Sequence, residues 1–285
     1  MSDMSEPLDT WVGRSERQTD IISADVLTRL AATLDHDRPA VAAGDIAPPL
    51  AHWLHFLPDT RQSGLGPDGH PLRGGFLPPV HHLPRRMWAG SRLTFPGDLK
   101  AGMTVERRST ITQVKEKSGS AGDLVFVTVR HEFGEPGGEA LVTDEHDIVY
   151  RAMTGPAVTP APAAPPPGAW SRSLVPDAVL LFRFSALTFN GHRIHYDRDY
   201  VTREEGYPGL VVHGPLTATL LVDLLRREMP GARLAGFSFR ARSPLFDGNR
   251  MTVHGNPPDA DGRVQLWATN HEGGLAMEAE ATVSS

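Results

Sequence analysis

A proline-rich run over residues 154–170, Thr-Gly-Pro-Ala-Val-Thr-Pro-Ala-Pro-Ala-Ala-Pro-Pro-Pro-Gly-Ala-Trp, constrains the fold of this chain most. Proline lacks a backbone N–H and has a fixed φ, so such a run joins neither a helix nor the interior of a sheet. We expect an extended, semi-rigid linker, with a long surface loop as the alternative. The linker divides the chain into an N-terminal unit, residues 1–153, and a C-terminal unit, residues 171–285.

Each unit contains a helix and ends in a series of strand-like runs. Ser23 is the expected N-cap of a helix that carries Leu27 and Leu30 on one face. A second helix starts at Pro215, carries leucines at helical spacing and ends at Pro230-Gly231. Runs separated by turns predict strands at 92–95, 103–113, 124–133, 140–151, 179–184, 234–241, 250–254, 263–269 and 276–283.

The two units show weak self-similarity. Residues 76–81, Phe-Leu-Pro-Pro-Val-His, match residues 208–213, Pro-Gly-Leu-Val-Val-His. Residues 99–105 match residues 245–253 if two residues are inserted. Together with the linker, these matches predict an internal duplication, although the second match also arises readily by chance. The duplicated unit is expected to be a helix wrapped by an antiparallel sheet, an α+β architecture.

Charge and cysteine content exclude several classes of function. The net charge of −6 argues against nucleic-acid or membrane-surface binding, because both require a basic face. The chain has no cysteine, which excludes disulfides, thiolate metal sites and a cysteine nucleophile. The start resembles neither a secretory signal nor a transit peptide, and no run is long enough to span a bilayer. We expect a cytoplasmic protein.

Residues 184–215 contain the residues best suited to chemistry. A helix N-terminus such as that at Gly214 offers free N–H groups that can stabilise an oxyanion, for example a thioester enolate. His195 can transfer protons near neutral pH. Asn190 cannot titrate, but its amide can hold a water molecule. An enolate site, a proton carrier and a bound water are what a hydratase requires.

The same residues also have plainer interpretations. Asn-Gly is a common turn dipeptide, and His195-Tyr-Asp is compatible with an ordinary loop cluster. His192 and His195 are spaced for one helix face, but no further ligand stands at a recognised metal-site spacing, so no metal is expected.

The segment Phe-Asn190-Gly-His-Arg-Ile-His195-Tyr-Asp, with the later Glu205-Gly-Tyr-Pro-Gly-Leu-Val-Val-His213-Gly214-Pro, resembles the MaoC-like, (R)-specific enoyl-CoA hydratases. The resemblance is greatest to the double-hot-dog branch of that group. Its specific part covers about thirty residues, and the duplicated layout extends it over most of the chain. It implies an α+β double hot-dog, with two repeats of a long central helix wrapped by an antiparallel sheet.

The resemblance also implies an activity and the roles of site residues. The activity is reversible hydration of an enoyl-CoA, such as mesaconyl-C4-CoA or a similar short or branched 2-enoyl-CoA, to the 3-hydroxyacyl-CoA. The family motif has an acidic residue five positions before its histidine, and this chain has Asn190 there. His195 is then expected to act as base and acid, with Asn190 holding the water and Gly214 binding the thioester carbonyl. Asp197 is the alternative source of a carboxylate.

The remaining assignments concern the substrate. Coenzyme A or phosphopantetheine is expected only as part of the substrate, and no separate cofactor is expected. Residues assigned to substrate binding are His213, Tyr207, Pro208, Arg193, Arg240 and Arg242, with Arg183 as a further cation. The N-terminal unit is interpreted as a degenerate repeat that supports the acyl pocket, in which the aromatic candidates are Trp53, Phe56, Phe76 and Trp88; ordinary core packing is the alternative for them.

Three other functions remain open. A 3-hydroxyacyl-carrier-protein dehydratase would use the same chemistry on a carrier-bound substrate. A hot-dog thioesterase usually requires a carboxylate on the central helix, but here Thr217 and Thr219 come early and the first acid, Asp223, comes late. A non-catalytic acyl-binding subunit is compatible with Asn190 in place of an acid. A homodimer is the expected assembly.

Overall fold

A computed structural model describes residues 7–37, 40–119, 122–152 and 160–284, and in it ten strands form one antiparallel sheet. The strands are β1 (Ser15–Ile21), β2 (Arg85–Thr94), β3 (Thr104–Gly119), β4 (Gly122–Gly134), β5 (Val142–Arg151), β6 (Trp170–Leu174), β7 (Arg233–Ala241), β8 (Met251–Gly255), β9 (Arg263–Thr269) and β10 (Leu275–Ser284). Their order across the sheet is β1-β3-β4-β5-β2-β7-β10-β9-β8-β6.

The strand order confirms an internal duplication. The first five strands have the order 1-3-4-5-2, and β6 to β10 repeat this order from the opposite edge. The two repeats meet at β2 and β7, where residues 90–94 pair with residues 236–240. One continuous sheet therefore joins the repeats, and among the described residues its edge strands are β1 and β6.

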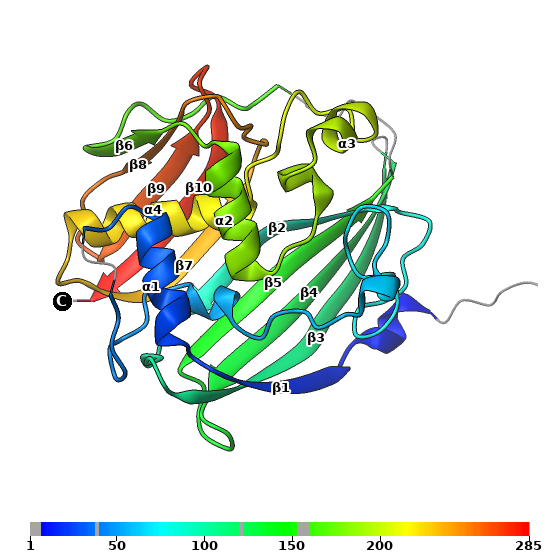
Figure 1. The fold of residues 1–285 in the computed structure, drawn as a ribbon, viewed down its shortest axis with the longest axis horizontal. Coiled ribbons are helices and arrows are strands. Elements are labelled where there is room, and N and C mark those ends of the chain that lie inside the picture. Colours follow the sequence, from blue (N-terminus) through cyan, green and yellow to red (C-terminus); the bar gives the residue numbers. More distant parts are fainter. Residues whose placement is uncertain (1–6, 38–39, 120–121, 153–159, 285) are drawn as a thin grey trace, which may run out of the picture.

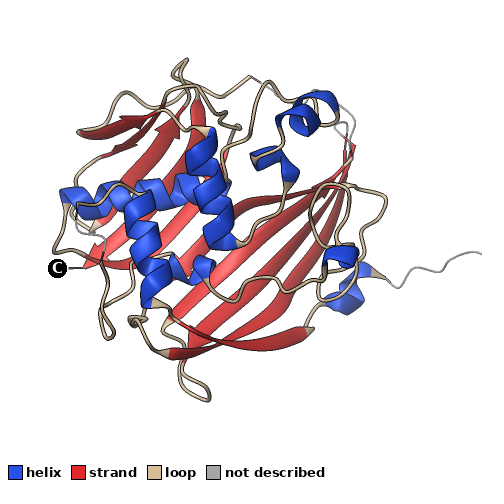
Figure 2. Ribbon diagram, viewed as in Figure 1, coloured by secondary structure: helices blue, strands red, loops and turns tan. Residues whose placement is uncertain are grey.

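The helices gather on one face of the sheet, as Figures 1 and 2 show. They are α1 (Ala24–Thr33), α2 (Ala178–Thr188), α3 (Arg198–Arg203) and α4 (Gly214–Glu228), with short 3-10 turns at η1 (Leu8–Trp11), η2 (Ala51–Leu54), η3 (Gln62–Gly64) and η4 (Arg193–His195). Ser23 and Asp177 cap α1 and α2 with their side chains, because each accepts a hydrogen bond from a backbone N–H in the first turn.

Helix α4 is the central helix of the second repeat and confirms the prediction from Pro215. Every residue from Leu216 to Leu225 is buried, including Asp223. A buried carboxylate needs partners, and Asp223 has three: Arg172 at 2.9 Å, Arg227 at 2.7 Å and His36 at 2.8 Å. This acid therefore ties α4 to β6 and to the segment after α1.

The first repeat has no equally long helix among the described residues. Helix α1 follows the edge strand β1 as α2 follows β6, so α1 corresponds to α2 and not to α4. The backbone contacts locate the counterpart of α4. The N–H of Ala47 donates to Leu99, as the N–H of Val212 donates to Leu245, both at 2.8 Å. The short turn η2 thus stands where α4 begins in the second repeat.

These contacts correct one of the two sequence matches. The match of residues 99–105 to 245–253 is confirmed, since both segments lead into corresponding strands, β3 and β8. The match of residues 76–81 to 208–213 is wrong, because the segment before η2 pairs in the position that residues 211–212 occupy.

Local structure differs from prediction in three further places. Residues 179–184, predicted as a strand, lie in α2; this helix is apolar on most sides and so lacks an amphipathic pattern. Strand β1 was missed because it is a mostly exposed edge strand with a polar sequence. Trp170, placed in the linker, begins β6. Pro162 accepts the N–H of Leu275 at the start of β10, and Ala163 pairs with Gly274 just before it. Residues 153–159, which hold the predicted start of the linker, lie outside the described residues.

Candidate active site

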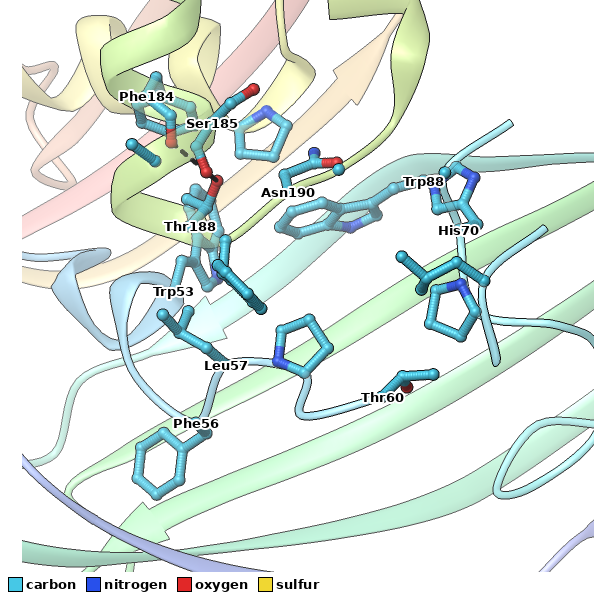
Figure 3. Close-up of a pocket in the computed structure, with 18 of the residues that line it drawn as sticks. Trp53, Phe56, Leu57, Thr60, His70, Trp88, Phe184, Ser185, Thr188 and Asn190 are labelled. Carbon is cyan, nitrogen blue, oxygen red and sulfur yellow. Dashed lines mark hydrogen bonds between the residues drawn. The ribbon is translucent and has the colours of Figure 1, made fainter. Parts of the chain in front are cut away.

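A cavity of about 900 Å³ lies where the two repeats meet, between the sheet and the segments over it. Its floor is the inner face of β2 to β5, which contributes Trp88, His131 and His146. Its other walls are residues 52–71 of the first repeat and residues 182–196 of the second (Figure 3). The predicted pocket aromatics Trp53, Phe56 and Trp88 line it, while Phe76 packs in a separate small core.

Asn190 lines this cavity just after α2 ends. The helix stops at Phe189, whose φ of 47° lies in the left-handed region. The side-chain oxygen of Asn190 accepts the N–H of His192 at 3.0 Å, and the backbone N–H of Asn190 donates to Ser185 at 2.9 Å. With its oxygen so held, Asn190 has a fixed orientation and keeps its NH₂ group for a ligand.

His195 lies behind the cavity wall, in η4, with 7 % of its surface exposed. Its Nδ1 donates to the carbonyl of Val211 at 2.7 Å, which leaves Nε2 as a free base. Burial lowers the pKa of His195 to about 3, so the ring is neutral at neutral pH. The ring stacks on His213 at a centroid distance of 3.7 Å.

Gly214 opens α4 directly after His213. Among the described residues, the Gly214 N–H has no backbone partner, as expected at a helix N-terminus. A Cβ on Gly214 would meet nothing within 4 Å, and the cavity reaches the next residue, Pro215. His213 is fully enclosed and bonds through Nε2 to the hydroxyl of Ser185 at 2.9 Å. The helix start is therefore open to a carbonyl oxygen, whereas His213 supports the wall.

The proposed cation sites lie in different places. Arg193 lines the cavity, but its guanidinium is held by Asp197 at 2.8 Å and lies over the ring of Tyr200. Arg240 lines a second cavity formed by a different set of residues, and Arg242 pairs with Glu278. Arg183 is exposed on α2. None of these arginines is free beside Asn190.

The other predicted residues also have defined surroundings. Tyr207 packs near Phe246 and beneath Arg85, and Pro208 is exposed; neither lines the cavity. Asp197, the alternative carboxylate, caps α3 by accepting the N–H of Tyr200 at 3.0 Å and is also bonded to Arg193. This double commitment does not favour a role for Asp197 in proton transfer.

Two residues of the first repeat were missed. His70 lines the cavity, and its Nδ1 lies 3.0 Å from a carboxylate oxygen of Asp68. The ring of His70 lies 3.9 Å from that of His192, between centroids. The loop that holds them is bonded to the motif, since the N–H of Arg193 donates to Asp68 at 2.9 Å. The Asp-Gly-His turn at residues 68–70 was the available signal, but only the fold shows what it contacts.

Charge and donor geometry define the role of Asp68. Burial alone would raise the pKa of Asp68, but the hydrogen bonds from the side chain and backbone of His70 outweigh it and lower the pKa well below its usual range. The ligand atoms of Asp68, His70 and His192 lie within 4.8 Å of one another, close enough for a metal ion. Asp68 is already satisfied by His70, so we interpret the group as a hydrogen-bonded Asp–His pair.

Comparisons with known proteins show which family this chain belongs to. The family model described as "Hydroxyacyl-thioester dehydratase type 2" matches residues 50–247, which include η2, the Asp68 loop and all of the motif. The chain belongs to this dehydratase family. One relative is the Mesaconyl-C(4)-CoA hydratase of Chloroflexus aurantiacus, 46% identical over 272 residues, or 94% of this chain and 95% of the relative.

Two solved structures share the fold of this family member. A MaoC-like dehydratase from Phytophthora capsici has a TM-score of 0.69 at 16% identity and covers 96% of both chains. A protein of Mycobacterium tuberculosis described as a double hot-dog has a TM-score of 0.59 at 15% identity, again with 96% of each chain covered. The predicted double hot-dog is thus confirmed. Among the described residues, however, the long central helix is present in the second repeat and not in the first.

Glycine at position 69 is required for the contact between the two repeats of this dehydratase. Its φ is +88°, and a Cβ there would lie 1.9 Å from the carbonyl oxygen of Gly191. Gly69→Ala is therefore expected to push the Asp68 loop off the motif and to lower kcat/KM at least ~10-fold. Gly137→Ala, at a positive φ with nothing within 4 Å, is the matched control. Equal activity of the two variants would contradict this contact.

Buried histidines predict how stability depends on pH. Burial lowers the pKa of His192 and His195 from 6.5 to about 3. In the unfolded chain these two rings therefore bind protons as the pH falls below 6.5. In the folded chain the same rings bind protons only when the pH approaches 3. Stability is full above pH 6.5 and is lost as the pH falls through this window. We expect the free energy of unfolding in urea to fall by at least ~2 kcal/mol between pH 7.5 and 5.0.

The exposed His271 supplies the control for this prediction. His271→Gln is expected to leave the pH dependence of unfolding unchanged, because the His271 ring is in contact with solvent in both the folded and the unfolded chain. Equal unfolding free energies at pH 7.5 and 5.0 would show that the buried rings are not held neutral.

Proposed function

We propose that this chain is a hydro-lyase that reversibly hydrates a 2-enoyl-CoA thioester, with mesaconyl-C4-CoA or a similar short or branched enoyl-CoA as its substrate. The observation that carries this proposal is 46% identity to a mesaconyl-C(4)-CoA hydratase over nearly the whole of both chains. The cavity supports it, because Asn190 and the start of α4 both border one space large enough for an acyl group.

In the proposed mechanism the thioester carbonyl accepts a hydrogen bond from the Gly214 N–H at the positive end of α4. Asn190 holds the water, and Nε2 of His195 takes its proton. The hydroxide adds to the β-carbon, negative charge gathers on the thioester oxygen, and the α-carbon is then protonated. This route requires a path for the water from Asn190 to His195, of whose surface 7 % is exposed.

The Asp68–His70 pair is a second candidate for proton transfer. The family motif has an acid where this chain has Asn190, and Asp68 brings a carboxylate to the same wall from the first repeat. His70 lies on the cavity side, in contact with His192. We therefore assign a protonated His70, oriented by Asp68, as the acid that gives its proton to the α-carbon. His195 keeps the proton taken from the water, and exchange with solvent then removes it from His195 and reprotonates His70.

Hydrolysis of the thioester is disfavoured by α4. The first acid of this helix, Asp223, is buried and held by Arg172, Arg227 and His36. Thr217 and Thr219 bond back to carbonyls of the preceding turn. The only other acid of this helix, Glu228, is exposed at its far end, so α4 presents no carboxylate to the cavity that could serve as the base of a thioesterase.

One assay distinguishes the candidate functions. The protein is incubated with crotonyl-CoA and with mesaconyl-C4-CoA, and both enoyl absorbance and free thiol are recorded. Loss of absorbance without thiol release is the expected result. Thiol release would indicate a thioesterase, and no change in either signal would favour an acyl-binding subunit. Greater activity on a crotonyl-carrier protein than on crotonyl-CoA would indicate a carrier-protein dehydratase.

We also propose a cytoplasmic homodimer that binds neither nucleic acid nor membranes. Val179 and Phe182 of α2 and Phe189, which follows the helix, are each more than 60 % exposed, and a second copy would cover them. Among the described residues no helix is both long and apolar enough to cross a membrane. Light scattering of the purified protein tests the dimer, and a monomeric mass would reject it.

A further inference from the structure

The proposed substrate carries a negative charge for which the proposed mechanism names no binding partner. Mesaconate is a methyl-branched, unsaturated dicarboxylic acid, so its C4 thioester keeps a free carboxylate. That carboxylate is attached directly to the carbon that the water attacks. A carboxylate loses its hydration when it enters a cavity, and it needs a cation with hydrogen-bond donors in return. Arginine suits this task best, because its guanidinium can bind both carboxylate oxygens.

Among the described residues, three arginines line the cavity: Arg86, Arg107 and Arg193. Arg193 is held by Asp197 through Nε at 3.1 Å and Nη2 at 2.8 Å. Arg107 donates to Gln18 at 2.9 Å and to the carbonyl of Phe56 at 3.3 Å. Both of these guanidinium groups are therefore committed to the protein itself.

Arg86 is different. Across the chain segments that the structure describes, no carboxylate oxygen lies within 4.0 Å of its guanidinium. Arg86 is partly buried on β2, opposite Tyr150 of β5, and it shares its face of the strand with Trp88, two residues on. Its neighbour Arg85 is paired with Glu205 at 3.3 Å. The Tyr150 hydroxyl interacts with Arg86 but carries no charge, so Arg86 brings to the cavity wall a positive charge with no carboxylate of the described residues beside it.

Arg86 lies at the end of the cavity that holds Asn190, where the hydration is proposed to take place. Its charge adds to the burial that lowers the pKa of His192, and His192 contacts both His70 and Asn190. Arg107 instead lies over the ring of Phe56, which Figure 3 shows on the far side of the cavity from Asn190. A carboxylate bound by Arg86 would therefore lie beside the carbon that Asn190 and His195 hydrate.

We propose that Arg86 is the binding subsite for the free carboxylate of a dicarboxylic enoyl thioester. This inference rests on the proposed hydratase function and goes beyond it, since it names the residue that selects the substrate class. Arg86 pairs with the carboxylate, fixes the β-carbon against the water on Asn190, and favours substrates with this carboxylate over simple enoyl thioesters.

The kinetic test compares mesaconyl-C4-CoA with crotonyl-CoA, which lacks the carboxylate. Arg86→Gln is expected to lower kcat/KM for mesaconyl-C4-CoA roughly 100-fold and to change kcat/KM for crotonyl-CoA less than about threefold. Arg86→Lys is expected to recover part of the loss, because it restores the charge without the paired donors. Arg92→Gln, an exposed position on the same strand, is the control and should change neither substrate.

A binding measurement separates failure of this subsite from failure of the proposed function. Saturated analogues cannot be hydrated, so calorimetry with methylsuccinyl-C4-CoA and butyryl-CoA reports binding alone. The parent is expected to bind methylsuccinyl-C4-CoA at least 10-fold more tightly than Arg86→Gln does, with equal affinities for butyryl-CoA.

Three results would overturn the subsite: equal binding of methylsuccinyl-C4-CoA by the parent and Arg86→Gln, unchanged turnover of mesaconyl-C4-CoA by the variant, or an equal loss on both substrates. A parent that hydrates neither substrate yet shows the binding difference would reject the proposed reaction and retain the carboxylate subsite.

Discussion

Replacing His195 with glutamine is expected to lower kcat/KM for hydration by about 10²–10⁴-fold while the protein stays folded, since this is the usual contribution of a general acid–base group. In the structure Nδ1 of His195 donates to Val211, and the lowered pKa keeps the ring neutral. Nε2 is then the free base. Glutamine can keep the bond to Val211 but cannot accept a proton at neutral pH. Turnover of crotonyl-CoA is the measurement.

His70→Gln is the decisive comparison for this prediction, because His70 also contacts the motif and lies on the cavity side. We expect a smaller loss for His70→Gln than for His195→Gln in the hydration direction. The reverse order would reassign the base to the Asp68–His70 pair. Near-parent activity of a folded His195→Gln variant would remove His195 from the mechanism altogether.

Asp144→Ala is expected to lower the free energy of unfolding by about 3–5 kcal/mol, the range for removing one partner of a buried charged group. Asp144 is fully buried on β5, beneath the cavity. One of its oxygens lies 2.7 Å from His146, 2.7 Å from Trp53 and 3.2 Å from His52. Burial alone would raise the pKa of Asp144, but these histidines outweigh it and hold the pKa far below its usual range.

The alanine variant would leave the donors of His52, His146 and Trp53 buried without an acceptor, and each unpaired donor costs about 1–3 kcal/mol. The control is Asp147→Ala on the same strand, because Asp147 is 32 % exposed and pairs with Arg92. A surface pair of this kind contributes about 1 kcal/mol or less. Urea unfolding of both variants at pH 7.5 tests the difference. Losses within 1 kcal/mol of each other would show that the Asp144 cluster is not a structural anchor.

Prediction from the sequence succeeded where the signals are local. The central helix was located by Pro215 at its start and the buried leucines along it, and the strands after it were found within one or two residues. Errors arose where the spacing of apolar residues does not follow the regular repeat of a helix or of a strand. Helix α2 is apolar on most sides and was taken for a strand, and the edge strand β1 is too polar to be recognised.

The motif itself was recognised, but its surroundings were not. Asn190 does line a cavity, and the Gly214 N–H does stand free at the start of α4. None of the four predicted cation sites is free beside Asn190. Arg193 is held by Asp197, Arg240 lines a different cavity, Arg242 pairs with Glu278 and Arg183 is exposed on α2. Whether an arginine has a carboxylate partner depends on acidic residues that are distant in the sequence. The spacing of residues along the chain does not show which of these acids it will meet.

The sequence by itself determined the duplicated α+β plan, the central helix and the segment that carries Asn190, His195 and Gly214. These features depend on periodicity, capping and residue types within a few turns of each other. The tertiary structure alone decided that the Asp68 loop of the first repeat would dock against this segment, and that Arg86, among the described residues, would be the cavity arginine without a carboxylate partner. Those two outcomes depend on packing between segments from opposite halves of the chain, where shape and the competition for charged partners decide which groups meet.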